Sequence, residues 1–444
     1  MKCKKLQKQI LPVILVLLAV LSLGCWPAVY FRQTRKAQEY RELVEQAKTL
    51  SSKGIYDDAI ACLLAADERK PGEYENLLLL AECYRKTGNE ALLTVCNRAI
   101  QSRPAEETPY VMKTEWYTQK QNYGAAYGTL EEARANGCSS AVLAQLEEKL
   151  DNLFLKRYIP ADGIAEWHTF GSQAYAVFSS AGSYGILRAD GNVSMAAEYP
   201  YLGMYDSGTG TLPARNDGIL CFVSTEGKRR LVPDIAADGL RSFSDGFAPF
   251  EKDGEWGYLD TGMKVRMAGL AEAGAFADGV AAVKKNGKWA LIDSSLNSLT
   301  PFAFADIRLD SYGYCAHFGR CIVGSGGLWY LADTKGTVLS QGYEDIRFPA
   351  SPSEEIAFCA DGRWGYMRRD GTVTVLPQYA DAKSFCCGLA PVKTEETWVY
   401  IRPDGTVVGN GTYTEAGEFT ADGTAVVRNG NSLYMIVMSR YFES

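Results

Sequence analysis

The sequence predicts an α+β multidomain protein, in which an N-terminal transmembrane helix precedes an α-helical repeat array and an all-β repeat domain. Three observations support this fold class. Residues 10–31 form an uninterrupted apolar run, and small residues recur every 33 or 34 positions between residues 37 and 155. A unit of about 35 residues then recurs from Gly182 to Gly430. Fixed periods of this size indicate repeat architectures, and 444 residues exceed one ordinary core.

The composition excludes several classes of function. With 47% hydrophobic and 22% charged residues, the chain is expected to fold rather than to be disordered. Its net charge of −7 argues against a nucleic-acid partner, which would favour a basic face. His168 and His317 are the only histidines in the sequence. This scarcity argues against a histidine-based metal site or a Ser-His-Asp triad, so we expect no metal, no cofactor and no catalytic residues.

The apolar run at the N-terminus predicts a membrane anchor. Lysines occupy four of the first eight positions, and the following 22 residues, Ile10–Phe31, span about 33 Å as a helix. That length crosses a hydrocarbon layer of about 30 Å. We therefore expect residues 1–9 in the cytoplasm, residues 10–31 in the membrane and residues 32–444 outside. Two alternatives stay open. LSLGC resembles a bacterial lipobox that would lipidate Cys25, and basic residues just after the span weaken the assignment of orientation.

Residues 37–155 carry a helical repeat. The motif KGIYDDAI at 53–60 is echoed by TGNEALL at 87–93 and QNYGAAY at 121–127. Counted from Gly54, Gly88 and Gln121, small residues lie seven positions before, at Ala47, Ala81 and Thr114, and eleven or twelve positions after, at Ala66, Ala99 and Ala133. Small side chains allow paired helices to approach closely. The segment resembles three tetratricopeptide repeats with a capping helix at Ser139–Leu155.

That resemblance implies a concave, peptide-binding surface formed by the first helix of each pair. The repeat positions place Lys48, Glu82, Arg85 and Glu115 on this surface. The carboxylate-clamp version of the family needs a basic, Asn-rich lining, and the two glutamates argue against it. A spacer that only holds the next domain away from the membrane is the alternative.

The most complete copy of the second repeat is DGEWGYLDTGMKV at 253–265, and a similar copy is DGRWGYMRRDGTV at 361–373. Alternating apolar residues lead into Asp-Gly turns, which favour type I′ hairpins, and a third apolar strand ends each unit. The pattern over residues 158–444 resembles the WG-repeat family of bacteria. Its repeat-defining residues are Trp256, Gly257, Trp289, Trp329, Trp364, Gly365 and Trp398. Ala290, Tyr330 and Val399 stand where that family has Gly. One aromatic residue per unit favours an internal packing layer over a carbohydrate-stacking surface.

Three or four strands per unit predict the blades of a β-propeller, seven to eight in number. We expect residues 171–180 to join residues 429–437 in a final blade that closes the ring. An open β-solenoid of stacked hairpins is the alternative.

Acidic and cysteine residues predict no special chemistry. Asp260, Asp293 and Asp333 each precede a turn that Asp favours, and their spacing lacks the density of a calcium loop. The twelve cysteines include no CxxC motif. Cys62, Cys83 and Cys96 occupy helical core positions, and Cys315 and Cys321 are the best candidates for a disulfide pair.

These observations predict a membrane-anchored binding or scaffold protein, without catalysis, at a bacterial cell surface. Its expected partner is a protein, a peptide or a glycan, in addition to the membrane itself. The alternative is a cell-envelope enzyme that acts on polysaccharide, or a carbohydrate-binding lipoprotein.

Overall fold

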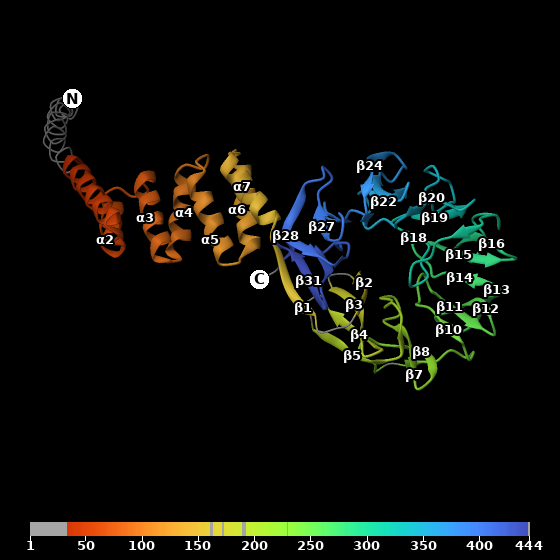
Figure 1. Ribbon diagram of the computed structural model, residues 1–444. Coiled ribbons are helices and arrows are strands. Elements are labelled where there is room, and N and C mark those ends of the chain that lie inside the picture. The colour runs from red at the N-terminus through yellow and green to blue at the C-terminus, as the bar shows by residue number, and fades with distance from the viewer. Residues whose placement is uncertain (1–32, 160–162, 171–172, 189–191, 229, 443–444) are drawn as a thin grey trace, which may run out of the picture. The chain divides into compact units, whose positions relative to one another are not determined.

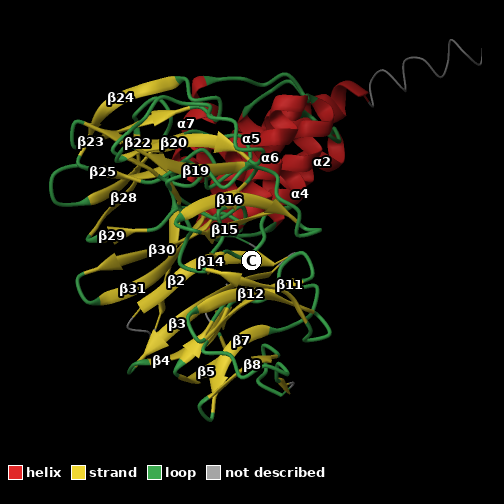
Figure 2. Ribbon diagram, turned by 90° about the vertical axis from the view of Figure 1, so that its right-hand side faces the viewer, coloured by secondary structure: helices red, strands yellow, loops and turns green. Residues whose placement is uncertain are grey.

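The structure, a computed structural model, describes residues 33–442 apart from 160–162, 171–172, 189–191 and 229. It contains two compact units, a helical one that ends at Leu150 and a β unit, Asp151–Phe442. Figures 1 and 2 show that helices make up the first and strands the second. No helix of the described residues combines the length and the apolar character needed to cross a membrane. The predicted span at residues 10–31 lies outside the described part of the chain.

The helical unit consists of consecutive antiparallel helices. They are residues 33–52, α2 (Tyr56–Arg69), α3 (Tyr74–Thr87), α4 (Ala91–Ser102), α5 (Thr108–Gln119), α6 (Tyr123–Ala135) and α7 (Ala141–Asp151). The turn between the helices of each pair contains one residue with positive φ: Gly54 at 78°, Gly88 at 67° and Gln121 at 58°. These are the positions that the predicted repeat aligns. The repeat is therefore confirmed at the level of local backbone geometry.

Small residues at the predicted positions allow the helices to pack closely. Ala47, Ala81 and Thr114 are exposed by 1% or less, and Ala66, Ala99 and Ala133 by 0%. Half-buried tyrosines, among them Tyr56, Tyr84 and Tyr117, surround this core. The predicted tetratricopeptide-like array is confirmed. The predicted capping helix is shorter than expected, because α7 ends at Asp151 and residues 154–155 begin a strand.

The β unit is a propeller whose described residues form eight sheets, here numbered as blades 1 to 8. Blade 1 contains β2 (Gly163–Phe170), β3 (Gln173–Ser180), β4 (Ser183–Arg188) and β5 (Val193–Tyr199). Blade 2 contains β6 (Tyr201–Leu202), β7 (Leu212–Asn216), β8 (Ile219–Val223) and β9 (Arg230–Leu231). Blade 3 contains β10 (Gly239–Leu240), β11 (Phe247–Lys252), β12 (Glu255–Asp260) and β13 (Val265–Leu270). Blade 4 contains β14 (Glu272–Ala273), β15 (Val280–Lys285) and β16 (Lys288–Asp293).

The remaining blades continue the same antiparallel pattern. Blade 5 contains β17 (Asp306–Ile307), β18 (Ala316–His317), β19 (Arg320–Ser325) and β20 (Leu328–Asp333). Blade 6 contains β21 (Asp345–Ile346), β22 (Ile356–Ala360), β23 (Arg363–Met367) and β24 (Val373–Tyr379). Blade 7 contains β25 (Asp381–Ala382), β26 (Ala390–Lys393), β27 (Trp398–Ile401) and β28 (Val407–Tyr413). Blade 8 contains β29 (Glu415–Ala416), β30 (Thr424–Asn429) and β31 (Ser432–Met438), followed by a 3₁₀ turn, Ser439–Tyr441.

The ring closes through a strand that the sequence pattern did not identify. β1 (Phe154–Ile159) pairs antiparallel with β31, from Phe154 opposite Met438 to Ile159 opposite Leu433. Residues 173–180, which we expected in this place, instead form β3 of blade 1. The prediction that an N-terminal strand closes the ring in the last blade was therefore right, but the strand that it named was wrong. Because the first strand of the unit completes the sheet of the last blade, the propeller is confirmed over the open solenoid.

Neighbouring blades are joined by a buried tyrosine two positions after the repeat tryptophan. The hydroxyls of Tyr258, Tyr366 and Tyr400 donate to carbonyl oxygens of the following blade, those of Gly274, Lys383 and Gly417, at 2.7, 3.1 and 2.7 Å. All three side chains are 0% exposed. Burial of a phenol is favourable only when its hydroxyl is bonded, so these bonds set the spacing between blades.

Candidate functional site

The repeat tryptophans lie between blades, near the start of the third strand. Trp289, Trp364 and Trp398 are exposed by only 5%, 7% and 7%, whereas Trp256 and Trp329 are half-buried. The sheet register shows that Leu220 and Leu433 hold the same position in blades 2 and 8. These are the positions of a packing layer.

In four blades a basic residue that follows the first short strand covers the tryptophan, and in blade 4 the Lys284 ammonium of β15 lies 5.3 Å from the ring centroid of Trp289. The guanidinium carbons of Arg241, Arg308 and Arg347 lie 4.2, 4.3 and 4.4 Å from the ring centroids of Trp256, Trp329 and Trp364. Lys383 lies 6.0 Å from the ring centroid of Trp398. Arg241, Arg308, Arg347 and Lys383 each come directly after the first short strand of their blade. Cations at such distances are attracted by the aromatic quadrupole.

The three arginines also form ion pairs with the first strand of the next blade. Arg241 pairs with Glu272 at 2.8 Å, Arg347 with Asp381 at 3.1 Å, and Arg308 with Asp345. We call each set of three a cation–tryptophan–acid cluster. Sequence reasoning missed the basic member, although Arg or Lys follows Leu240, Ile307, Ile346 and Ala382 at one repeat position. The clusters link blades 3 to 4, 5 to 6 and 6 to 7.

The glycine of the Trp-Gly pair is explained by a β-bulge. Trp364 lies opposite Tyr379 and Tyr366 opposite Val375, so β24 carries extra residues opposite Gly365. A Cβ atom on Gly365 would lie 2.4 Å from the carbonyl oxygen of Val375, and one on Gly257 2.2 Å from that of Met267. Real Cβ atoms do not approach that closely.

Blades without this glycine lack the crowding. Opposite Val399 the bulge is longer, because Trp398 pairs with Tyr413 and Tyr400 with Val408. Beside Ala290 and Tyr330 the fourth strand is reduced to isolated bridges, such as Trp289 to Phe304 and Trp329 to Tyr343. The glycine is therefore required by the close approach of the bulged strand.

The recurrent aspartates organise turns. The carboxylate of Asp260 accepts from the main-chain N–H groups of Gly262 and Lys264, and those of Asp293 and Asp333 accept in the same pattern. The bond from Lys264 is the largest cause of the lowered pKa of Asp260. Within the described residues no group of three or more His, Cys, Asp or Glu side chains is placed to hold a metal ion. His168 lies in β2, and His317 bonds to Asp310 at 3.1 Å.

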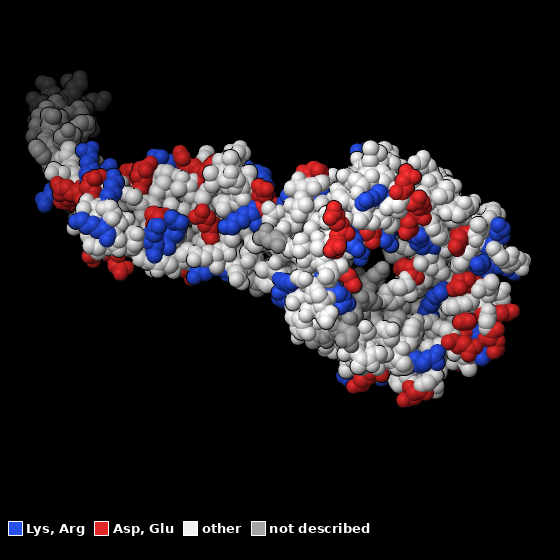
Figure 3. Space-filling model, viewed as in Figure 1, with Lys and Arg blue, Asp and Glu red and all other residues white. Residues whose placement is uncertain are grey.

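In the helical unit, three of the four predicted face residues lie together. Glu82 accepts two bonds from Arg85 at 2.8 and 2.9 Å, and Arg85 also lies 3.5 Å from Glu115 of α5. The hydrogen bonds from Arg85 are the largest cause of the lowered pKa of Glu82. Lys48 is separate and pairs with Glu45 of its own helix at 2.7 Å. Figure 3 shows acidic and basic side chains interspersed over these helices.

Apolar side chains accompany this ion-paired group. Leu78 and Leu79 of α3 lie one turn before Glu82, and Val111 and Met112 of α5 lie one turn before Glu115; all four are half-buried. The two sets are 33 residues apart, as the repeat requires. We call these seven residues the first-helix face: Leu78, Leu79, Glu82, Arg85, Val111, Met112 and Glu115.

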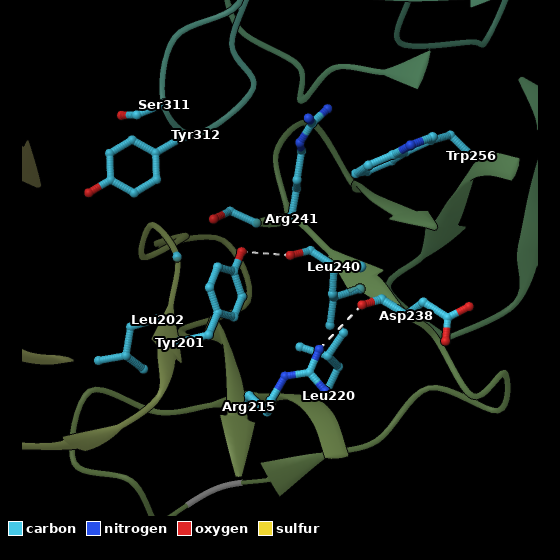
Figure 4. A pocket seen from close by; sticks show the side chains of 13 residues that line it. Tyr201, Leu202, Arg215, Leu220, Asp238, Leu240, Arg241, Trp256, Ser311 and Tyr312 are labelled. Atoms are coloured by element: carbon cyan, nitrogen blue, oxygen red, sulfur yellow. Dashed lines mark hydrogen bonds between the residues drawn. The ribbon is translucent and has the colours of Figure 1, made fainter. Parts of the chain in front are cut away.

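A pocket of about 390 Å³ lies on the propeller, lined mainly by blades 2 and 3 and by the loop that holds Ser311 and Tyr312 (Figure 4). The hydroxyl of Tyr201 donates to the carbonyl of Leu240 at 2.7 Å, and burial raises the pKa of Tyr201 to about 12. Arg215, Arg241 and Trp256 also line the pocket. Sequence analysis identified none of these residues as a pocket.

The cysteines are free thiols throughout the described residues. Cys83 and Cys96 are buried in the helical core, as predicted, and burial raises the pKa of Cys96 to about 12. Cys315 and Cys321, the expected pair, are both fully buried in one propeller core cluster and are not joined by a disulfide.

The neighbouring residues Cys386 and Cys387 differ from the rest, because their sulfur atoms lie 3.8 Å apart. Hydrogen bonding from Cys386 is the largest cause that lowers the pKa of Cys387, to about 7, and Tyr441 adds a second bond. Since the thiolate is the nucleophile, we expect iodoacetamide to modify Cys387 first, with a rate that is half-maximal near pH 7 instead of about pH 8.5.

The same shift links stability to pH. A pKa that is lower in the folded state stabilises the fold at pH values above the ordinary thiol pKa, and this stabilisation is lost as the pH falls through about 7. Mass-spectrometric mapping of alkylated peptides from pH 5 to 9 measures the rate. Uniform alkylation of Cys62 and Cys387, with the same midpoint, would contradict the prediction.

Comparison with known proteins identifies the β repeat. The family model described as WG containing repeat matches residues 238–256, 270–289 and 364–398. Three segments between residues 238 and 398 are therefore similar to the WG-containing repeat. These matches fall in blades 3, 4, 6 and 7 and include four of the repeat tryptophans, Trp256, Trp289, Trp364 and Trp398. The predicted WG resemblance is confirmed for this part of the chain. No curated protein matches the sequence.

Solved structures are similar to each unit separately. A eukaryotic initiation factor shares 14% identity over 64% of this chain and 85% of its own, with a TM-score of 0.41. Hsv2 of Kluyveromyces lactis shares 11% over 60% of this chain and 92% of its own, with a TM-score of 0.36. The first TPR of Spaghetti, bound to an HSP90 peptide, shares 18% over 26% of this chain and 94% of its own, with a TM-score of 0.23.

Proposed function

We propose that this protein is a membrane-anchored binding protein that holds a peptide segment of a partner protein on its first-helix face, without catalysis. In this proposal residues 10–31 anchor the chain, and residues 32–444 lie outside the cytoplasm. The apolar run with its lysine-rich start supports the anchor, since its length suits a bilayer.

The observation that carries the proposal is the composition of the first-helix face. Leu78, Leu79 and Met112 pack against the helical core yet remain partly exposed, at repeat-equivalent positions on adjacent first helices. Apolar side chains left partly open beside a polar group are typical of surfaces that bind another chain. Arrays of stacked helix pairs commonly use such a face for recognition.

The charges of the face limit the peptide that fits it. Arg85 lies between Glu82 and Glu115, so its charge is already balanced by two carboxylates. An acidic tail would meet these carboxylates, and like charges brought together at an interface oppose binding. The face therefore suits a segment anchored by apolar side chains, with a basic or neutral residue beside the glutamates.

Site-specific photo-crosslinking in membranes that contain the full-length chain tests this function. A photoreactive residue at Met112 should give a discrete adduct with a partner peptide, which peptide mapping identifies. The matched control carries the same residue at Leu64 of α2, a second helix, where the native side chain is 44% exposed. We expect an adduct at Met112 and none at Leu64. Equal adducts at both positions, or none at Met112, would refute the proposal.

A further inference from the structure

The pocket in Figure 4 lies where the repeat omits a complete cation–tryptophan–acid cluster. At the boundary between blades 2 and 3, Gly203 holds the basic position, Leu220 the tryptophan position and Gly239 the acidic position. The equivalent residues one boundary later are Arg241, Trp256 and Glu272. Three small or aliphatic residues replace three large ones, and all three line the pocket. The cavity is thus built into the sequence of this boundary.

One guanidinium of the pocket forms no ion pair with the residues that the structure describes. Arg215 stands opposite Leu220, and its guanidinium donates to the carbonyl oxygens of Gly218 at 3.1 Å and Asp238 at 3.3 Å. Among the described residues it forms no ion pair. Arg241, the other guanidinium of the pocket, is paired with Glu272 at 2.8 Å.

The one carboxylate of the lining is engaged elsewhere. Asp238 accepts from the main-chain N–H of Asp253 at 2.8 Å and lies 3.5 Å from the Lys252 ammonium. That backbone bond is the largest cause of the lowered pKa of Asp238. The direct contacts of the Asp238 carboxylate are thus with groups other than Arg215, so the Arg215 guanidinium keeps N–H groups that can pair with an anionic ligand.

The other lining residues indicate which chemistry the uncharged part of the ligand should have. Tyr201 and Trp256 contribute aromatic rings to the lining, and Leu220 contributes an aliphatic side chain. Ser311, which is exposed, contributes a hydroxyl group. A volume of about 390 Å³ lies at the small end of ligand pockets, which range from about 300 to 1,000 Å³. It suits one compact molecule. Arginine recognises planar carboxylates through paired N–H donors.

We propose that this pocket binds a small carboxylate-bearing molecule, with its carboxylate on Arg215 and its body against Tyr201, Leu220 and Trp256. A sugar acid and an N-acylated amino acid both present this chemistry. The proposal is independent of the peptide face of the helical unit.

Isothermal titration calorimetry on the full-length protein in detergent tests it. The probes are D-glucuronate and N-acetyl-L-alanine, each compared with a neutral counterpart, D-glucose and N-acetyl-L-alaninamide. We expect saturable binding of at least one acid, with a Kd of about 1 mM or below, and at least tenfold weaker binding of its neutral counterpart. The acid that binds more tightly identifies the source. Binding of neither acid, or equal binding of acid and neutral probe, overturns the proposal.

Three variants connect the binding to this pocket. Arg215→Gln should weaken binding about tenfold or more, because it removes the charge and keeps a polar side chain. Leu220→Trp should abolish binding with an unchanged or higher Tm, since it restores the residue found at this position in blades 3 to 7. Arg428→Gln is the matched control, because Arg428 stands opposite Leu433 as Arg215 stands opposite Leu220. Unchanged binding in Arg215→Gln, or loss of binding in Arg428→Gln, would contradict the assignment.

Discussion

Replacing Trp364 by alanine is expected to lower the free energy of unfolding of the propeller by about 3–5 kcal/mol. The indole is 7% exposed and packs in a core cluster with Tyr366, Ala382 and Val399, which come from blades 6 and 7. The substitution leaves a cavity between the two blades. It also removes the ring that supports Arg347, whose ion pair with Asp381 joins the same blades.

Urea denaturation followed by circular dichroism measures this loss. Leu376→Ala is the control in the same blade, because its side chain is 76% exposed and should change stability by less than about 0.5 kcal/mol. A nearly neutral effect of Trp364→Ala would place the indole on a binding surface and would contradict the packing role that we assign to the repeat tryptophans.

Gly365→Ala is expected to destabilise the propeller by about 1–3 kcal/mol, although alanine adds only one carbon atom. The new Cβ would lie 2.4 Å from the carbonyl oxygen of Val375 and 2.8 Å from the main-chain nitrogen of Pro377. Both obstacles are backbone atoms within the bulge, so relief requires the strand β24 to move.

Gly128→Ala is a matched control with the opposite expected sign. Gly128 lies within α6, and a Cβ there would meet no atom within 4 Å. Alanine in a helix interior is favoured over glycine by up to about 1 kcal/mol. Thermal unfolding of both variants, followed by circular dichroism, measures the two effects. Stabilisation by Gly365→Ala would show that the bulge does not require glycine.

Local features of both repeats were predictable from the sequence. The turns at Gly54 and Gly88 and the hairpins after each Trp strand follow from residues a few positions apart, whose conformational preferences act within one repeat. The buried Ala47, Ala81 and Ala99 follow from period alone, since each repeat presents the same face to its neighbour. The basic residues of the clusters could also have been identified from the sequence, because Arg308 and Arg347 each follow Asp-Ile.

The closing strand and the pocket could not be read in this way. β1 has no repeat signature, and its partner β31 begins more than 270 residues later, at Ser432. The pocket depends on Gly203, Leu220 and Gly239 together. Each of them, considered alone, looks like ordinary sequence variation between repeats. For the same reason, the role of Arg215 cannot be inferred from the sequence, because it depends on neighbours that are distant along the chain.

By itself, the sequence determined the two periods, the type of secondary structure in each unit and the turns that end each strand or helix, because these depend on contacts between near neighbours in the chain. Tertiary structure alone decided which strand closes the ring, which boundary between blades is left unfilled and which arginine there lacks an ion pair among the described residues. Those properties arise from residues that are distant in sequence and meet only when the ring is complete.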